Sequence, residues 1–235
     1  MKRQVSGVRP CRQAGRFQGS GINAGILILF ILLVPMCTFQ HALAEANGAD
    51  SLVAEVETKL AAINDLSGSF TQSSYIKDLE ETQQYAGEFY IKKPSSIMWE
   101  YKSPRDEKII MQKDTTWIHK KSQNQVIKSA FSKESYNQAP IAMLTSMVKL
   151  KDDYDITMPE KNALHLIPKR KIGSVQMIVI ETVSGNFPVR TLTIFDNYGN
   201  IVIIELSDVK INQELDASLF QFITPPGAEV YDMSQ

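Results

Sequence analysis

The sequence predicts a mostly β protein in which one antiparallel sheet is accompanied by few helices. Two observations lead to this fold class. From Leu66 onward, apolar and polar residues alternate with a period of two, which is typical of half-buried strands. The alternating segments are short and are separated by tight turns such as Ser184–Asn186 and Asn197–Asn200. Strands joined by such turns form an antiparallel meander, a single sheet that curls as it grows.

The N-terminus predicts a secretory signal peptide over residues 1–44. Its basic region contains five Lys and Arg residues and no acidic one. The apolar run that follows, residues 24–34, is short for a membrane span and ends at Pro35. Ala42 and Ala44 are the small residues that signal peptidase requires before its cleavage site. The alternative, an uncleaved membrane anchor, fits Pro35 and the two alanines less well. We therefore expect residues 45–235 to form one domain.

Removal of this segment changes the charge and the cysteine content of the chain. Of 25 basic and 26 acidic residues, five basic ones are lost, so the mature chain carries 20 against 26, a net charge of −6. This balance gives no indication of a nucleic-acid-binding face. Cys11 and Cys37 are removed as well, which excludes disulfides, thiolate metal sites and cysteine nucleophiles. Acylation of Cys37 is disfavoured because the preceding Met36 is not small.

The order of the expected elements follows from these periodicities. Asp50–Asn64 reads as an amphipathic helix, Pro140–Val148 as a short helix that starts at proline, and Asp216–Phe220 as one helical turn. After the alternation that starts at Leu66, strands are expected at residues 87–93, 97–102, 108–112, 115–119, 154–158, 163–168, 174–183, 189–196 and 201–211.

The mature sequence contains no recognisable catalytic or metal-binding motif. Its two histidines, His119 and His165, lie outside any metal-ligand spacing, and no nucleophile elbow or phosphate loop is present. Strand residues 175–180 and 201–206 are apolar on both faces, which indicates that helices cover one face of the sheet. Between sheet and helices lies either a filled core or an apolar cavity, and the pattern is compatible with both.

Several short motifs follow one another in a fixed order along residues 45–235. They are Phe70–Gln72, Gly87–Pro94, Met98–Pro104, Trp117, Ala139–Leu144, Leu219–Phe222 and Pro225–Val230. In this order, and with a signal peptide and this length, the chain resembles the outer-membrane lipoprotein carrier (LolA) family over nearly all of the mature sequence. The resemblance implies a strongly curved antiparallel sheet, an incomplete β-barrel lidded by short helices that enclose an apolar cavity.

The resemblance also implies a function. Such a protein is a periplasmic carrier rather than an enzyme, taking acylated lipoproteins from an inner-membrane ABC transporter to a receptor lipoprotein on the outer membrane. It needs no cofactor and no metal, it has no nucleic-acid partner, and we expect a monomer. Two alternatives remain open: a lipid-binding sensor or receptor on the same fold, and a periplasmic hydrolase that uses carboxylates and one of the two histidines.

The same resemblance assigns the candidate site. The arginine that precedes the proline in the family, and that latches the lid through helix carbonyls, falls on Lys93 here, which keeps the charge but loses the planar fork. The cavity is expected to be lined by strand residues Phe89, Ile91, Trp99, Tyr101 and Trp117, opposite lid residues Ile141, Leu144 and Val148. No catalytic residue is expected. The basic stretch Lys120–Lys128 has no assigned role.

The signal-peptide interpretation predicts the first residue of the mature protein. N-terminal sequencing of the exported form should begin at Glu45, because Ala42 and Ala44 satisfy the cleavage rule. A mature chain that begins with an acylated Cys37 would contradict the prediction and would make the protein membrane-attached.

Overall fold

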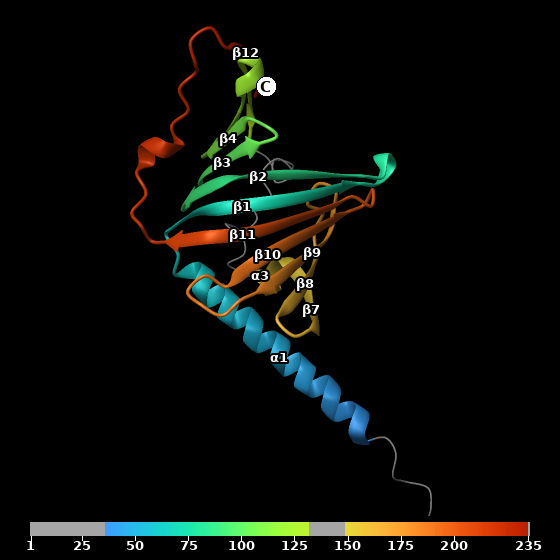
Figure 1. The fold of residues 1–235 in the computed structure, drawn as a ribbon. Helices are drawn as coiled ribbons and strands as arrows, with labels where there is room; N and C mark the ends of the chain where they lie inside the picture. Colours follow the sequence, from blue (N-terminus) through green and yellow to red (C-terminus); the bar gives the residue numbers. More distant parts are fainter. Residues whose placement is uncertain (1–35, 132–148, 235) are drawn as a thin grey trace, which may run out of the picture.

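The computed structural model describes residues 36–131 and 149–234, with side chains from Gly48 onward. In these residues twelve strands form one sheet in the order β12-β6-β5-β4-β3-β2-β1-β11-β10-β9-β8-β7. Figure 1 shows that the sheet twists and curves strongly from β12 at one end to β7 at the other. The expected fold class, mostly β with a strongly curved open sheet, is confirmed.

The strands are β1 Asp65–Ile76, β2 Glu81–Lys92, β3 Ser96–Ser103, β4 Glu107–Gln112, β5 Thr115–Lys120, β6 Gln125–Ala130, β7 Tyr154–Glu160, β8 Ala163–Pro168, β9 Val175–Thr182, β10 Val189–Asp196, β11 Ile201–Ile211 and β12 Glu229–Met233. The helical segments are α1 Met36–Ala61, η1 Lys77–Leu79, η2 Lys121–Gln123, α3 Leu150–Asp153 and η5 Ala217–Phe220. Strand pairing is antiparallel throughout the described sheet except between β12 and β6, which are parallel. The strand β6 was not expected, and β2 begins at Glu81 rather than Gly87.

Helix α1 begins earlier and ends sooner than the periodicity predicts. It starts at Met36, so that it includes Ala42 and Ala44, and it ends at Ala61. Its apolar stripe is buried as expected, since Val53, Val56 and Leu60 are at most 4% exposed. Within the described residues, no helix has both the length and the apolar composition to cross a membrane.

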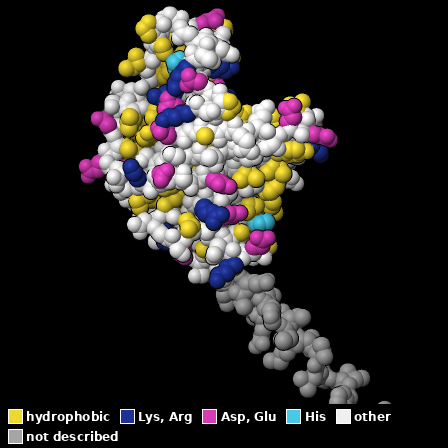
Figure 2. All heavy atoms as spheres, viewed as in Figure 1, with side chains coloured by type: hydrophobic (Ala, Val, Ile, Leu, Met, Phe, Trp, Pro, Cys, Tyr) yellow, Lys and Arg dark blue, Asp and Glu magenta, His cyan; other side chains and the backbone are white. Residues whose placement is uncertain are grey.

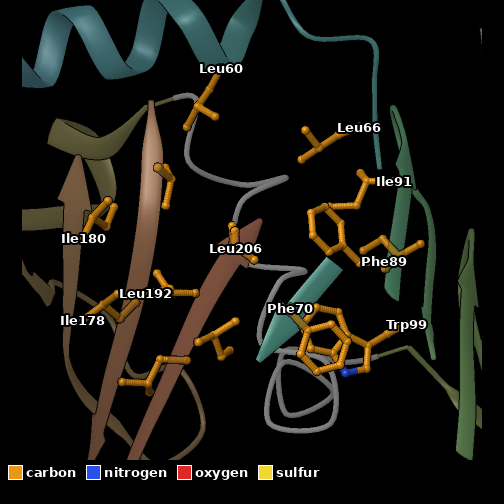
Figure 3. Close-up of a cluster of buried hydrophobic side chains, with 14 of the residues drawn as sticks. Leu60, Leu66, Phe70, Phe89, Ile91, Trp99, Ile178, Ile180, Leu192 and Leu206 are labelled. Atoms are coloured by element: carbon orange, nitrogen blue, oxygen red, sulfur yellow. The ribbon is translucent and has the colours of Figure 1, made fainter. Parts of the chain in front are cut away.

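The sheet buries apolar side chains on two faces, which form two separate clusters. The inner cluster joins both halves of the sheet to α1 (Figure 3), and its most buried members are Val53, Val56, Phe70, Phe89, Trp99, Ile109, Met111, Leu150, Leu164, Leu166, Ile178, Ile180, Leu192 and Ile204. Because strands from the two ends of the sheet contribute to one cluster, this face is the concave one. The expectation that the first helix lies on the concave side is therefore met by α1, whereas Pro140–Val148 lies outside the described residues.

The outer cluster covers the opposite face of β2–β5. Met98, Ile110 and Phe220 form its buried centre, and the C-terminal segment between β11 and β12 supplies Leu215 and Phe222 as well as Phe220. Two contacts hold the start of this segment: the buried Asp65 carboxylate accepts from the backbone N–H groups of Gln213 (2.7 Å) and Glu214 (3.0 Å), and Lys92 donates to the Leu215 carbonyl. The segment from Gln213 to Phe222 is thus a strap across the outer face (Figure 1).

The close packing of β2 on β3 predicts the effect of one substitution. A Cβ atom on Gly87 would lie 2.0 Å from the Glu100 carbonyl oxygen and 2.7 Å from the Phe70 ring. We expect Gly87→Ala to lower the free energy of unfolding by about 1–3 kcal/mol in urea denaturation, because neither neighbour can withdraw easily. As a control, Gly48→Ala on α1 meets only the flexible Met158 side chain and should be neutral or stabilising. Equal stability of the two variants would contradict the prediction.

Candidate functional site

Four of the expected cavity residues lie together on the inner face. Phe89 pairs with Trp99, and Ile91 pairs with Ile97, across the β2–β3 ladder, which places their side chains on one face of the sheet. Tyr101 follows on the same face of β3, and the exposed fractions of Phe89 and Trp99 are both 0%. The two-residue spacing along each strand produces this arrangement, because residues two apart point to the same side of a sheet.

An aromatic group forms the centre of this half of the inner cluster. The Phe70 and Trp99 rings stack with centroids 3.6 Å apart, and Tyr101 meets Phe70 edge-on at 5.5 Å (Figure 3 shows Phe70 and Trp99). The Tyr101 hydroxyl donates to Gln72 Oε1 at 3.1 Å, and burial raises the pKa of this phenol. The opposite half of the cluster is aliphatic, with Ile178, Ile180 and Leu192 facing across the sheet.

The Trp99 indole nitrogen is buried without a hydrogen bond of normal geometry. It lies close enough to the Tyr101 hydroxyl to offset part of the rise in the pKa of Tyr101 that burial causes. A buried donor of this kind costs about 1–3 kcal/mol. Apart from Tyr101 and Gln72, the surroundings of Trp99 in the described cluster are apolar. The interior therefore suits a hydrocarbon, with one unused donor at its centre.

In the inner cluster, apolar side chains of α1 and of the sheet pack against one another. Beside the end of α1, the described cluster leaves a small pocket of about 20 Å³, lined by Leu60, Ile63, Leu66 and Ile91 beneath Lys93. Farther along, Tyr85, Ile156, Met158 and Val202 pack against the cluster but stay partly exposed. Figure 2 shows apolar side chains gathered beneath the far end of the β1–β2 hairpin, beside β7–β9. An apolar surface thus continues from the closed core toward solvent.

Lys93 fastens the end of α1 to the sheet. Its Nζ donates to the Leu60 carbonyl at 2.6 Å, and its backbone N–H donates to the Asn64 carbonyl at 2.9 Å. A cation at a helix C-terminus interacts favourably with the helix dipole, whereas burial lowers the pKa of this amine. Lys93 thus binds the end of α1, while the latch expected from Lys93 to the lid at residues 140–148 lies outside the described residues.

Further polar contacts hold α1 and the residues that follow it. Asn212 accepts from the Asn64 N–H at 2.7 Å and donates to the Ala62 carbonyl at 3.2 Å. About one turn before the end of the helix, Glu57 accepts from the backbone N–H of Leu150 at 2.6 Å, and Asp50 pairs with Lys151 at 2.9 Å, which fixes α3 against α1. The helix that covers the apolar interior is therefore fastened by a small number of hydrogen bonds.

The structure corrects the expected position of Trp117. Its ring stacks on Phe222 of the outer cluster with centroids 4.9 Å apart. The Lys128 ammonium lies over the Trp117 ring, 5.5 Å from its centroid. The register explains this: Trp117 pairs with Ile110, which pairs with Met98, and all three point away from Trp99. Trp117 therefore packs the strap and does not line the inner face.

The remaining expected residues are placed as follows. The lid residues Ile141, Leu144 and Val148 lie outside the described residues. The basic stretch Lys120–Lys128 forms η2 and β6, where Lys121 pairs with Glu100 (2.8 Å) and Asp106 (3.0 Å), and Lys128 pairs with Asp232 (2.8 Å). These partners give the unassigned lysines a structural role at the β6 end of the sheet.

The two histidines are not brought together. His119 lies on β5 and His165 on β8, near opposite ends of the sheet. Burial lowers the pKa of His119, and its ring meets Phe222 of the strap. In the described part of the chain, no group of three or more His, Cys, Asp and Glu side chains is placed to hold a metal ion.

Comparison with known proteins gives a consistent picture. The sequence profile of the family described as "Outer membrane lipoprotein carrier protein LolA" matches residues 61–223. A relative from Alkalilimnicola ehrlichii is 23% identical over 208 residues, which cover 88% of this chain and 96% of the relative. One from Neisseria meningitidis serogroup C is 30% identical over 169 residues, covering 70% and 79%. One from Legionella pneumophila is 25% identical over 205 residues, covering 87% and 97%. Each relative is named outer-membrane lipoprotein carrier protein.

The latch geometry predicts a local effect of removing the Lys93 ammonium. Lys93→Met keeps the length of the side chain but loses the donor to the Leu60 carbonyl. We expect amide hydrogen exchange at the end of α1 to accelerate about tenfold, equivalent to a loss of about 1.4 kcal/mol of local stability.

A second lysine on α1 offers a matched control. Lys59 forms an ion pair with Glu55 on the same helix at 2.6 Å, and Lys59→Met should leave exchange at residues 60–64 nearly unchanged. If Lys93→Met and Lys59→Met behave alike, the apolar stripe alone holds the helix and Lys93 is not a latch.

Proposed function

Because this chain belongs to the outer membrane lipoprotein carrier (LolA) family, we propose that it carries acylated lipoproteins through the periplasm by burying their acyl chains against the inner face of its sheet. The observation that carries the proposal is the inner cluster: one curved apolar face, closed by a helix that few polar contacts hold. An exposed acyl chain costs about 0.8 kcal/mol per CH₂ in water, so transfer across an aqueous compartment requires such a face.

The packing implies how cargo would be accommodated. Because α1 covers the apolar interior in the described residues, acyl chains would replace side chains that this helix contributes, chiefly those of Val53, Val56 and Leu60. The exchange substitutes one set of apolar contacts for another, so the empty and loaded states differ little in free energy. This near balance is required, because a ligand shifts an equilibrium only by its difference in affinity for the two states. The Lys93 latch favours the empty state and thereby assists release.

The compartment and the partners belong to the same proposal. A cleaved signal peptide would deliver the chain to the periplasm, where an inner-membrane ABC transporter would load it and a receptor lipoprotein on the outer membrane would unload it. The carrier itself requires no cofactor, because release and insertion depend on relative affinities. A sensor or receptor on the same fold would bind lipid without passing it on. A hydrolase would use carboxylates with one histidine, so replacing His119 or His165 would abolish its activity.

A transfer assay tests the proposed function. Inner-membrane vesicles carrying a labelled lipoprotein should release it into the soluble fraction as a one-to-one complex with this protein, and native mass spectrometry should show the intact lipoprotein bound. Outer-membrane vesicles should then take up the label. Complex formation without uptake would support the sensor alternative, and recovery of a cleaved lipoprotein would support the hydrolase.

A further inference from the structure

The sheet is split between β10 and β11. Their ladder runs only from Phe195↔Ile201 to Thr191↔Glu205, whereas β11 remains paired with β1 as far as Leu66↔Ile211. In the described structure, residues 206–211 of β11 are therefore paired with a strand along one edge alone. On the other side, the β9–β10 hairpin turns away and closes on itself through Val183 N–H donating to the Pro188 carbonyl at 2.9 Å. A gap in an otherwise continuous sheet results.

The backbone of β11 is irregular beside this gap. The β1–β11 register shifts between Ser67 and Ser69, and Asp208 has a left-handed φ of 51°. Gly68 lies opposite, where a Cβ atom would be 2.8 Å from the Ser207 carbonyl oxygen and 2.9 Å from the Phe89 ring. Bulges of this kind re-aim side chains and are enriched beside functional sites.

The gap contains a pocket of about 440 Å³ between hairpin residues 183–190 and β11 residues 206–211, which we call the split pocket. Its volume lies in the range of about 300–1,000 Å³ that small-molecule sites occupy. Val189 and Leu206 belong to both the pocket lining and the inner cluster, and they are 2% and 8% exposed. The floor of the split pocket is therefore the apolar core itself.

The rim of the split pocket is polar. Asn186, Arg190 and Asp208 line it, and among the described residues no ion pair or side-chain hydrogen bond engages any of the three. The open edge of β11 adds backbone N–H and C=O groups to this rim. An apolar floor under a rim of unused donors and acceptors suits an amphiphile, rather than a free hydrocarbon chain or a soluble polar ligand.

The split pocket also adjoins the end of α1. Ile211, at one end of the pocket, pairs with Leu66, which lines the small pocket under Lys93. The next residue, Asn212, is the one that holds Ala62 and Asn64. Displacement of the end of α1 would join the two pockets through Leu66 and Ile211.

We propose that the split pocket binds the lipid-modified N-terminal cysteine of the cargo, where acyl chains and peptide diverge; this inference rests on the proposed function. The acyl chains pass inward between Val189 and Leu206. Arg190 and Asn186 donate to the ester and amide carbonyls that join the chains to the cysteine. The first peptide residues leave along the open edge of β11, where strand addition satisfies their backbone groups.

A pair of photoreactive lipopeptides tests this placement. Both carry two palmitoyl chains on an N-terminal cysteine; one bears a diazirine at the end of an acyl chain and the other at the second peptide residue. With the purified protein, the peptide probe should cross-link to residues 183–190 or 206–211, and the acyl probe to strands of the inner cluster. If the acyl probe reaches the inner cluster while the peptide probe reacts elsewhere, the split pocket is wrong and the carrier function stands. If neither probe cross-links, the proposed function fails as well.

Three variants test the split pocket and its polar rim. Ser207→Trp fills the split pocket and should weaken lipopeptide binding at least about tenfold, whereas Glu205→Trp, exposed on the same strand outside the pocket, should not. Arg190→Ala should weaken the lipopeptide about threefold or more and leave palmitic acid binding unchanged. Circular dichroism confirms folding. Equal losses for Ser207→Trp and Glu205→Trp, or an Arg190→Ala effect shared by palmitic acid, would overturn the proposal.

Discussion

The structure depends on the need to cover one large apolar face of an open sheet. Twelve described strands curve without closing, so the concave side chains of β1–β5 and β8–β11 cannot be buried by a second sheet. In the described residues they are buried against each other, against α1 and against Leu150 of α3. Burial of this kind is worth about 25 cal/mol per Å² of apolar surface, and it is non-directional. An apolar ligand of suitable shape can therefore replace the helix without new specific contacts.

The outer face of the sheet carries fixed packing, whereas the inner face carries the helix that we propose acyl chains displace. On the outer face, the strap from Gln213 to Phe222 packs Phe220 and Phe222 on β3–β5, and Asp65 holds its start through two backbone N–H groups. On the inner face, the polar attachments of α1 and its end in the described residues include those of Lys93, Asn212 and Glu57 and the Asp50–Lys151 ion pair. Because the outer packing does not involve α1, the helix can move while β2–β5 keep their pairing. The fold thus confines rearrangement to the side that we propose meets the cargo.

Much of this arrangement could be predicted from the sequence, and the failures have physical reasons. Alternation placed Phe89, Ile91, Trp99 and Tyr101 on one face because the side-chain period of a strand is fixed. Trp117 was misplaced, although the two-residue turn after β4 sets Ile110 opposite Trp117 and determines the face. The strand β6 was missed because polar residues and Lys128 conceal its alternation, and Lys128 is explained only by a distant partner, Asp232. The split pocket could not be predicted, since it arises where a ladder ends between strands that pair elsewhere.

Trp99 and Trp117 lie on opposite faces of the sheet, so their fluorescence can show which face acyl chains contact. The chain contains only these two tryptophans, so Trp117→Phe and Trp99→Phe leave one indole on the inner face or one on the outer face. A lipopeptide whose acyl chains are brominated quenches indole fluorescence only at near contact. Strong quenching of Trp99 with little effect on Trp117 is the result that acyl binding to the inner cluster predicts. Equal quenching of both indoles, or quenching of Trp117 alone, would contradict it.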